Sequence, residues 1–149
     1  MRWQAVLAGA LASVVLASVV LAHAAHADVR IVGDPGGEVS SYVRKFHVMR
    51  DSGERIVIDG PCLSACTLLT GIIPGDRVCV TSRAVLGFHA ASYYDDASRS
   101  LVPTSEGSRQ VMRLYPAQIR SWIDRHGGLT PRLLLLRGRE LFAFYRACR

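Results

Sequence analysis

The fold of this chain is decided by the stretch Ile56-Val57-Ile58-Asp59-Gly60-Pro61-Cys62-Leu63-Ser64-Ala65-Cys66. A short β-branched run ends in Gly60-Pro61, and a segment of small and apolar residues follows it. This order predicts a buried strand, a tight turn and the start of a helix. A serine at such a corner projects toward solvent, and the backbone N–H groups of the first helical turn point at it. Ser64 is therefore the first candidate for a chemically active residue.

Strand and helix patterns alternate on both sides of this stretch. The sequence predicts a helix at 38–51, where apolar residues recur at helical spacing, and a short buried helix at 64–70 that Gly71 ends. Strands are predicted at residues 29–32, 55–58, 78–81 and 84–89. Strands that alternate with helices pair in parallel, so we expect an α/β fold of βαβ type, with a mostly parallel sheet flanked by helices.

The C-terminal half carries weaker signals. Residues 90–105 are polar and rich in Tyr, Asp and Ser, which predicts a loop or a small hairpin. Residues 106–126 have helical spacing and are expected to bend near Pro116. Thr130-Pro131 has the pattern of an N-cap followed by proline, and predicts an apolar helix through Leu136. A last short helix or strand is expected at 139–145.

The first 27 residues have the composition of a Sec-type signal peptide and are expected to lie outside the fold. Arg2 gives a positive start, residues 5–21 are almost entirely Ala, Val, Leu, Gly and Ser, and Ala25-His26-Ala27 is a cleavage signal of the A-x-A type. Ala22-His23-Ala24 is a second possible cleavage site. An uncleaved anchor is the alternative, although the apolar core is short for a membrane span. We expect a periplasmic or extracellular protein without a stable membrane anchor after cleavage.

Charge and length restrict the function further. Residues 28–149 are long enough for one domain with a modest core. The whole chain carries 18 Lys and Arg against 12 Asp and Glu, a formal net charge of +6. The arginines are scattered, with no basic run and no stripe of basic and aromatic residues. We therefore expect a solvated basic surface and no nucleic-acid partner.

All four cysteines, Cys62, Cys66, Cys79 and Cys148, follow the predicted signal peptide. An even number of cysteines in an oxidising compartment predicts two disulfides. Three pairings are possible, and the sequence alone does not choose among them; we favour Cys62 with Cys66 and Cys79 with Cys148. A zinc site is the competing hypothesis, but no second ligand pair matches the Cys-x3-Cys spacing.

Ser64 has potential partners for nucleophilic catalysis. His89 follows it by 25 residues at the end of a predicted strand, where it could act as a general base. Gly36 and Gly37 lack side chains, so their N–H groups could approach a reacting carbonyl. Ala65, directly after the serine, could supply a second N–H group to this oxyanion hole.

Each of these features also has a purely structural explanation. A serine at the position of Ser64 can cap a helix without taking part in chemistry. His89 can be a half-buried histidine that binds a backbone carbonyl. Asp34-Pro35-Gly36-Gly37 can be a turn before a helix. Only the order and spacing of the three features favour a catalytic role.

Together, Asp34-Pro35-Gly36-Gly37, Cys62-Leu63-Ser64-Ala65-Cys66 and Gly87-Phe88-His89 resemble motifs of the Clp protease/crotonase superfamily, in its exported bacterial Clp-protease-like branch. They look like its oxyanion loop, its nucleophile segment and the segment that carries its base. The intervals of 27 residues from Gly37 to Ser64 and 25 from Ser64 to His89 are also similar to those of the family. The resemblance is good over 29–91 and poor beyond.

The resemblance implies a third catalytic member, an acid that follows the base. Glu140 lies closest to the position the family uses, although the family pattern around it is absent. Asp124 is a second candidate, and Asp95 or Asp96 could reach the site if the loop folds back. The family's opening strand is missing and the chain is short, so ring assembly is not inferred.

These observations lead to competing functional hypotheses. The first is an exported serine hydrolase of peptidase type that uses a Ser-His dyad or an incomplete triad on a peptide or other extended chain, with no cofactor and no metal. The second is a non-catalytic periplasmic binding or structural domain that retains the fold. A crotonase-type enzyme acting on acyl thioesters is third, and export disfavours it because such cofactors are cytosolic.

Overall fold

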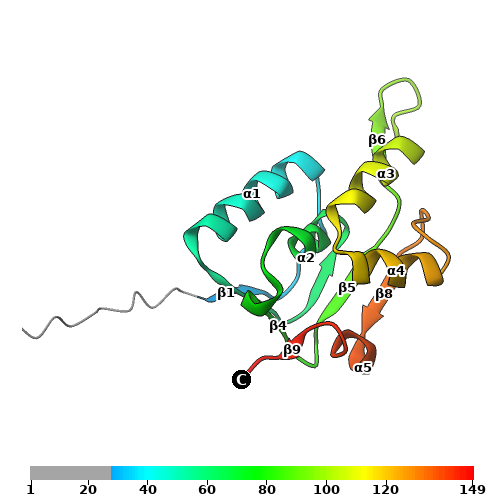
Figure 1. Ribbon diagram of the computed structural model, residues 1–149. Coiled ribbons are helices and arrows are strands. Elements are labelled where there is room, and N and C mark those ends of the chain that lie inside the picture. Colours follow the sequence, from blue (N-terminus) through cyan, green and yellow to red (C-terminus); the bar gives the residue numbers. More distant parts are fainter. Residues whose placement is uncertain (1–27) are drawn as a thin grey trace, which may run out of the picture.

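A computed structural model of the chain describes residues 28–149, so the predicted signal peptide at 1–27 lies outside the described residues. The fold is mixed α/β, with helices around partly parallel sheets (Figure 1). The first sheet contains β1 (Asp28–Ile31), β2 (Arg55–Ile58), β4 (Val78–Val80) and β9 (Arg146–Ala147), in that spatial order. Every pair of neighbours in this sheet is parallel.

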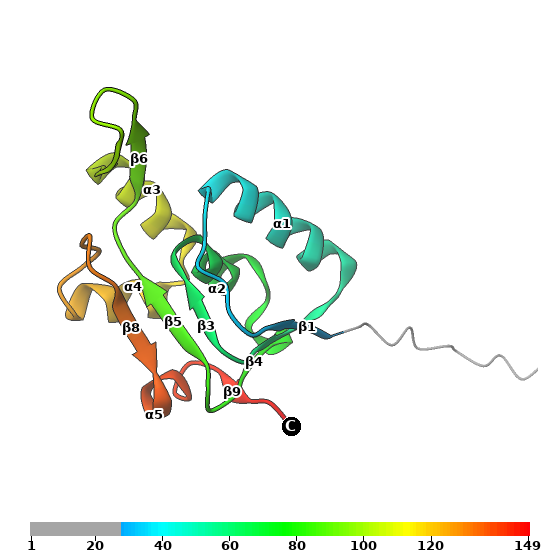
Figure 2. The same ribbon diagram turned by 180° about the vertical axis from the view of Figure 1, so that it is seen from behind.

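A second sheet contains β3 (Pro61–Leu63), β5 (Val85–Phe88) and β8 (Leu134–Arg137), which run side by side (Figure 2). β3 and β5 are parallel, whereas β8 is antiparallel to β5. β6 (Ser92–Asp95) and β7 (Ser100–Pro103) form a separate hairpin that protrudes from the domain in both views. The expected α/β class is therefore confirmed, but the sheets are only partly parallel, because β6, β7 and β8 pair antiparallel.

The helices follow the predicted order with shifted boundaries. α1 (Val39–Ser52) ends at Gly53, whose left-handed backbone donates its N–H to the carbonyl of Arg50. A 3₁₀ helix, η1 (Ser64–Leu68), continues into α2 (Leu69–Ile72), and a short η2 (Gly75–Arg77) precedes β4. The long helix predicted at 106–126 is divided at Pro116 into α3 (Ser105–Leu114) and α4 (Ala117–Arg125). α5 (Gly138–Leu141) is the last helix.

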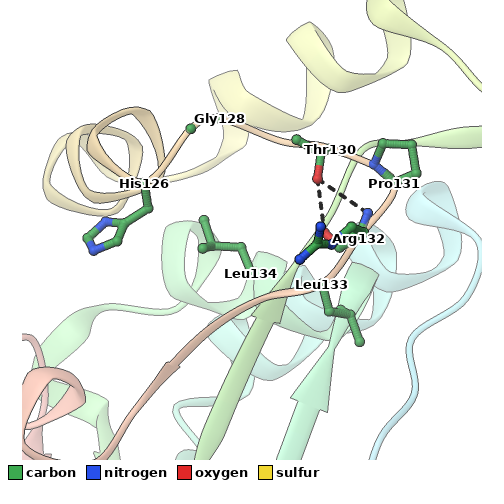
Figure 3. Close-up of a pocket in the computed structure, with 8 residues that line it drawn as sticks. His126, Gly128, Thr130, Pro131, Arg132, Leu133 and Leu134 are labelled. Carbon is green, nitrogen blue, oxygen red and sulfur yellow. Dashed lines mark hydrogen bonds between the residues drawn. The ribbon is translucent and has the colours of Figure 1, made fainter.

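The helix predicted from Thr130-Pro131 through Leu136 is wrong, because residues 134–137 form strand β8. The Thr130 hydroxyl does not cap a helix; it bonds with the N–H and the carbonyl of Arg132 in a local turn (Figure 3). The apolar run that follows pairs with β5, with Leu136 fully buried opposite Leu86. Pairing with an existing strand edge overrides the weak local signal for a helix.

A single apolar core joins both sheets to the helices. Side chains from one face of the first sheet meet those of α1, η1, α2 and α4 and those of β5 and β8. The largest fully buried members are Phe46, Phe88, Ile56, Ile58, Leu68, Leu69, Leu86, Ile119, Ile123, Leu136, Leu141 and Val78. This core fixes the carboxyl ends of β3 and β5, which carry the candidate site.

Candidate active site

Ser64 occupies a strained corner at the end of β3. Its φ is 54°, and among residues 28–149 only Arg99 is another non-glycine residue with a positive φ. The turn predicted at Gly60-Pro61 is not formed there, because Pro61 is the first residue of β3; the sharp bend comes three residues later, at Ser64. Left-handed backbone at a serine is costly and concentrates at functional sites. The half-exposed Ser64 side chain thus stands at a strand-to-helix elbow.

A disulfide encloses this corner. Cys62 is bonded to Cys66, with a Cα–Cα distance of 5.3 Å, and both cysteines are fully buried. Cys79 is bonded to Cys148, so both bonds agree with the pairing favoured from the sequence. Both bonds together use all four cysteines, so none in the described chain is a free thiol of the kind the zinc hypothesis requires. The two disulfides fit an oxidising, exported environment.

The loop before α1 is hydrogen-bonded alongside β3. Asp34 donates its N–H to the Pro61 carbonyl at 2.8 Å and accepts from the N–H of Leu63 at 2.9 Å. These bonds bring Gly36, with φ of 82°, directly onto the elbow. A Cβ at Gly36 would lie 2.5 Å from the carbonyl oxygen of Leu63 and 2.8 Å from the nitrogen of Ala65. Only glycine fits this position.

The amides predicted for the oxyanion hole differ in their availability. Gly36 donates its N–H to Oδ1 of Asp34 at 2.9 Å, so this N–H is not available to a ligand. Gly36 instead lets the loop approach the elbow closely. Within residues 28–149, no hydrogen bond uses the N–H of Gly37. Ala65 lies in the first turn of η1, where N–H groups have no partner within the helix. Gly37 and Ala65 are therefore the two candidate donors.

Asp34 also ties this loop to α1. Tyr42 donates its hydroxyl to Oδ1 of Asp34 at 2.5 Å, and Nζ of Lys45 lies 3.7 Å from Oδ2. Burial, and secondly this hydrogen bond to Asp34, raises the pKa of Tyr42 to about 12. Tyr42 consequently stays a neutral donor at physiological pH. A loop held at both ends can keep its glycine amides in a fixed orientation.

His89 lies directly after β5, and its ring is held by the next residue. Nδ1 of His89 lies 2.7 Å from the carbonyl oxygen of Ala90. A carbonyl only accepts, so Nδ1 carries the hydrogen and the neutral ring has its lone pair on Nε2. The segment itself is fixed, because Ala90 donates its N–H to the Thr130 carbonyl at 2.7 Å and Ala91 donates to Oγ of Ser108 at 3.0 Å.

Ser64 and His89 share a cleft of about 300 Å³, which Gly37 and Val39 also line. They also share an adjoining apolar pocket of about 20 Å³, with Ala65, Leu68 and Val111 among its walls. The structure thus brings the predicted serine, histidine and donor amides to one place. Within the described residues, no hydrogen bond joins the Ser64 hydroxyl to His89; such contacts are often long until a substrate binds.

The carboxylates suggested as the third catalytic member lie elsewhere. Oε1 of Glu140 accepts a hydrogen bond from the Trp122 indole at 2.6 Å and lies 3.7 Å from Nε2 of His126. This site binds α5 to α4, so Glu140 is occupied there and not at His89. Asp124 is exposed on α4, and Asp95 accepts from the N–H of Ser98 in the hairpin. Asp96, next to Asp95, is exposed. Within residues 28–149, no carboxylate is paired with His89.

Two buried residues that were not predicted from the sequence, Thr67 and Tyr115, form hydrogen bonds on the inner side of the elbow. Oγ1 of Thr67 donates to the Ser64 carbonyl at 2.6 Å and lies 2.7 Å from the Tyr115 hydroxyl. Burial raises the pKa of Tyr115 to about 12. Tyr115 also lines the small apolar pocket beside Ser64. A threonine three residues after Ser64 is a signal that could have been used, whereas Tyr115 is 48 residues from its partner.

Another hollow, of about 530 Å³, lies at the turn between α4 and β8 (Figure 3). Its lining includes His126, Gly128, Thr130, Arg132 and Leu134 but neither Ser64 nor His89.

Within residues 28–149, no three His, Cys, Asp or Glu side chains are grouped so that they could hold a metal ion. Over the same residues, none of the helices has the length and apolar character that crossing a membrane requires.

Comparison with models of known protein families gives no match for this chain. Comparison with curated proteins also gives no match.

Proposed function

We propose that this protein is an exported serine hydrolase of peptidase type, with Ser64 as nucleophile and His89 as general base. The observation that carries the proposal is the placement of both residues, with Gly37, around one cleft. The positive φ of Ser64 supports it, because such strain is characteristic of nucleophile elbows. The proposed family is the Clp protease/crotonase superfamily, on the motifs quoted above.

In this mechanism the Ser64 hydroxyl attacks the substrate carbonyl and transfers its proton to Nε2 of His89. The N–H groups of Gly37 and Ala65 stabilise the negative oxygen of the tetrahedral intermediate. His89 then protonates the leaving amine, and water hydrolyses the acyl-enzyme by the same steps in reverse. An extended peptide would dock by strand addition beside the Gly36-Gly37 loop.

The Ala90 carbonyl would take the orienting role of the third catalytic member. It holds the His89 ring in the required tautomer, but it stabilises the imidazolium by a dipole and not by a full charge. Loss of the correctly oriented carboxylate function in a serine-protease triad lowers kcat by about 10⁴. We therefore expect slow turnover, and covalent labelling of Ser64 is a more sensitive assay than substrate hydrolysis.

The test is reaction with a fluorophosphonate probe, followed by mass spectrometry of the labelled peptide. The intact protein should be labelled at Ser64, and Ser64→Ala should abolish the label. Ser92→Ala is the matched control, since Ser92 lines the same cleft; it should be labelled normally. His89→Ala should slow labelling by about 10²-fold or more.

A non-catalytic binding domain is the second candidate. It is favoured by one observation: within the described residues, the imidazole of His89 bonds only to a backbone carbonyl and to no carboxylate. In that case the folded protein would resist the probe, and Ser64→Ala would change only its stability. Binding of an extended peptide to the unlabelled protein would then be unaffected by Ser64→Ala.

A further inference from the structure

The first sheet has one apolar face and one face rich in arginine. Ile56, Ile58, Val78 and Val80 are fully buried on the core side. Alternate residues point to the opposite side, because successive side chains on a strand alternate between faces. The register aligns Arg30 with Val57, Val57 with Cys79, and Cys79 with Arg146, and Arg55 precedes Val57 by two positions on the same strand. These side chains therefore belong to the outer face.

Part of this outer face is neutralised internally. Asp59 is buried, and its carboxylate accepts hydrogen bonds from Arg30 at 2.7 Å and Arg83 at 2.5 Å. Thr81 donates to the same carboxylate at 2.6 Å. These two arginines therefore share one protein counter-ion, the carboxylate of Asp59.

The remaining arginines converge on a hollow of about 780 Å³, lined by Arg55, Arg146 and Arg149 together with Cys79 and Ala147. Within residues 28–149, the one ion pair that involves these three arginines joins Arg55 to Asp28 at 3.9 Å. Arg146 donates to the Asp76 carbonyl at 2.5 Å, which orients its guanidinium without neutralising it. The hollow thus has an excess of positive charge.

The backbone that carries these arginines is fixed. β9 pairs with β4, and Cys148 donates its N–H to the Val80 carbonyl at 3.0 Å. The disulfide from Cys148 to Cys79 joins the same segment covalently to the floor of the hollow. Because Cys148 is fixed, its neighbour Arg149 is also held close to the sheet. Preorganised charges bind a ligand with a smaller loss of entropy than mobile ones.

The geometry points to a binding site for phosphate oxyanions in this hollow, formed by Arg55, Arg146 and Arg149. Guanidinium groups donate in a planar fork that matches phosphate oxygens, and charge-assisted hydrogen bonds of this type are about twice as strong as neutral ones. The volume exceeds that of a single inorganic phosphate, which favours a diphosphate or a phosphodiester head group. β9 lies near one end of β5, and β6 follows the other end (Figures 1 and 2). The hollow and the Ser64 cleft have no lining residue in common, so the site does not depend on the proposed hydrolase activity.

The experiment measures binding of pyrophosphate by calorimetry and of phosphatidylglycerol vesicles by co-sedimentation. The protein is compared with Arg55→Gln/Arg149→Gln and with Arg125→Gln/Arg139→Gln, whose replaced residues are exposed and do not line the hollow. We expect saturable binding that weakens about tenfold or more in the first variant and is unchanged in the second. Ser64→Ala should bind like the unaltered protein.

Saturable binding of pyrophosphate would identify a small soluble phosphate ligand, and binding of phosphatidylglycerol vesicles alone would identify a lipid head group; either supports the site. Two results would overturn it. One is the absence of binding to both probes. The other is an equal loss in both double variants, which would indicate a response to net charge only. Circular dichroism of the variants confirms that they are folded.

Discussion

Gly36 lies in direct contact with the elbow: a Cβ built on it would be 2.6 Å from the Cβ of Ser64. The contact joins the glycine loop, which precedes α1, to the end of β3. It means that the position of the Gly37 amide and that of the Ser64 hydroxyl are not independent.

Gly36→Ala should displace the loop or the elbow. The added methyl group would overlap backbone atoms, and alanine is strained at φ of 82°. We expect a loss of roughly 1–3 kcal/mol of stability and of most probe labelling. Gly33→Ala is the control in the same loop, since a Cβ there meets nothing within 4 Å. Equal behaviour of the two variants in urea unfolding and labelling would contradict this account.

Ser64→Gly should separate stability from reactivity. Glycine relieves the left-handed strain at φ of 54°, so this variant should be more stable than Ser64→Ala by about 1 kcal/mol while both fail to label. Arg99→Gly, at φ of 52° in the hairpin, should gain stability similarly and keep full labelling. The measurement is the urea midpoint of each variant. A Ser64→Gly protein less stable than Ser64→Ala would show that the elbow is not strained.

Removal of the two disulfides should affect stability and Ser64 labelling differently. Cys62→Ala/Cys66→Ala opens a loop with a sequence separation of 4, whereas Cys79→Ala/Cys148→Ala opens one of 69. Loop-closure entropy then predicts losses of about 2 and about 4 kcal/mol, respectively. Labelling of Ser64 should fall mainly in the first variant, because its bond encloses the elbow. The measurements are urea unfolding and Ser64 labelling on the same samples. If the variant with the larger loss of stability also showed the larger loss of labelling, the prediction would be contradicted.

Asp59 should make the fold sensitive to acid. The hydrogen bond from Thr81, with those from Arg30 and Arg83, lowers its pKa to about 2. A carboxyl group with a lowered folded pKa stabilises the protein above its unfolded pKa, near 4, and this contribution is lost as the pH falls through about 2. Asp59→Asn should therefore flatten the decline of the urea midpoint over that interval. The exposed Asp96→Asn is the control and should leave the decline unchanged.

Local patterns predicted most of the first half of the fold. Strand β2 at Arg55–Ile58 has the predicted bounds, and α1 is shifted by one residue from the expected 38–51. Both elements have a strong apolar pattern and a clear terminator, Gly53 in the case of α1. Strand β3 was not predicted, because Gly60-Pro61 reads locally as a turn. Pro61 is the first residue of β3, a position that proline tolerates in a strand.

The error at Thr130–Leu136 has a non-local cause. An apolar run bounded by a threonine and a proline is compatible with a helix or a strand, and its period does not decide between them. The edge of β5, which lies far away in sequence, decides in favour of a strand. The sequence of the run contains no information on that edge.

The candidate site was predictable where it depends on residue type and spacing. Ser64 and His89 could be named from the elbow pattern and the end of a strand. The group that orients the His89 ring could not be predicted, because it is the backbone carbonyl of Ala90 and every residue has such a carbonyl. The hydrogen bond from the Gly36 N–H to the Asp34 carboxylate could not be predicted either, because it depends on the turn that the loop adopts.

The bond between Cys62 and Cys66 makes the elbow depend on chemistry outside the polypeptide. In a reducing cytosol these residues are two thiols, and the corner that holds Ser64 lacks its covalent closure. A newly synthesised copy therefore reaches its final geometry only after an oxidant has acted on it. The geometry of the corner is thereby coupled to the redox state of the compartment that holds the chain.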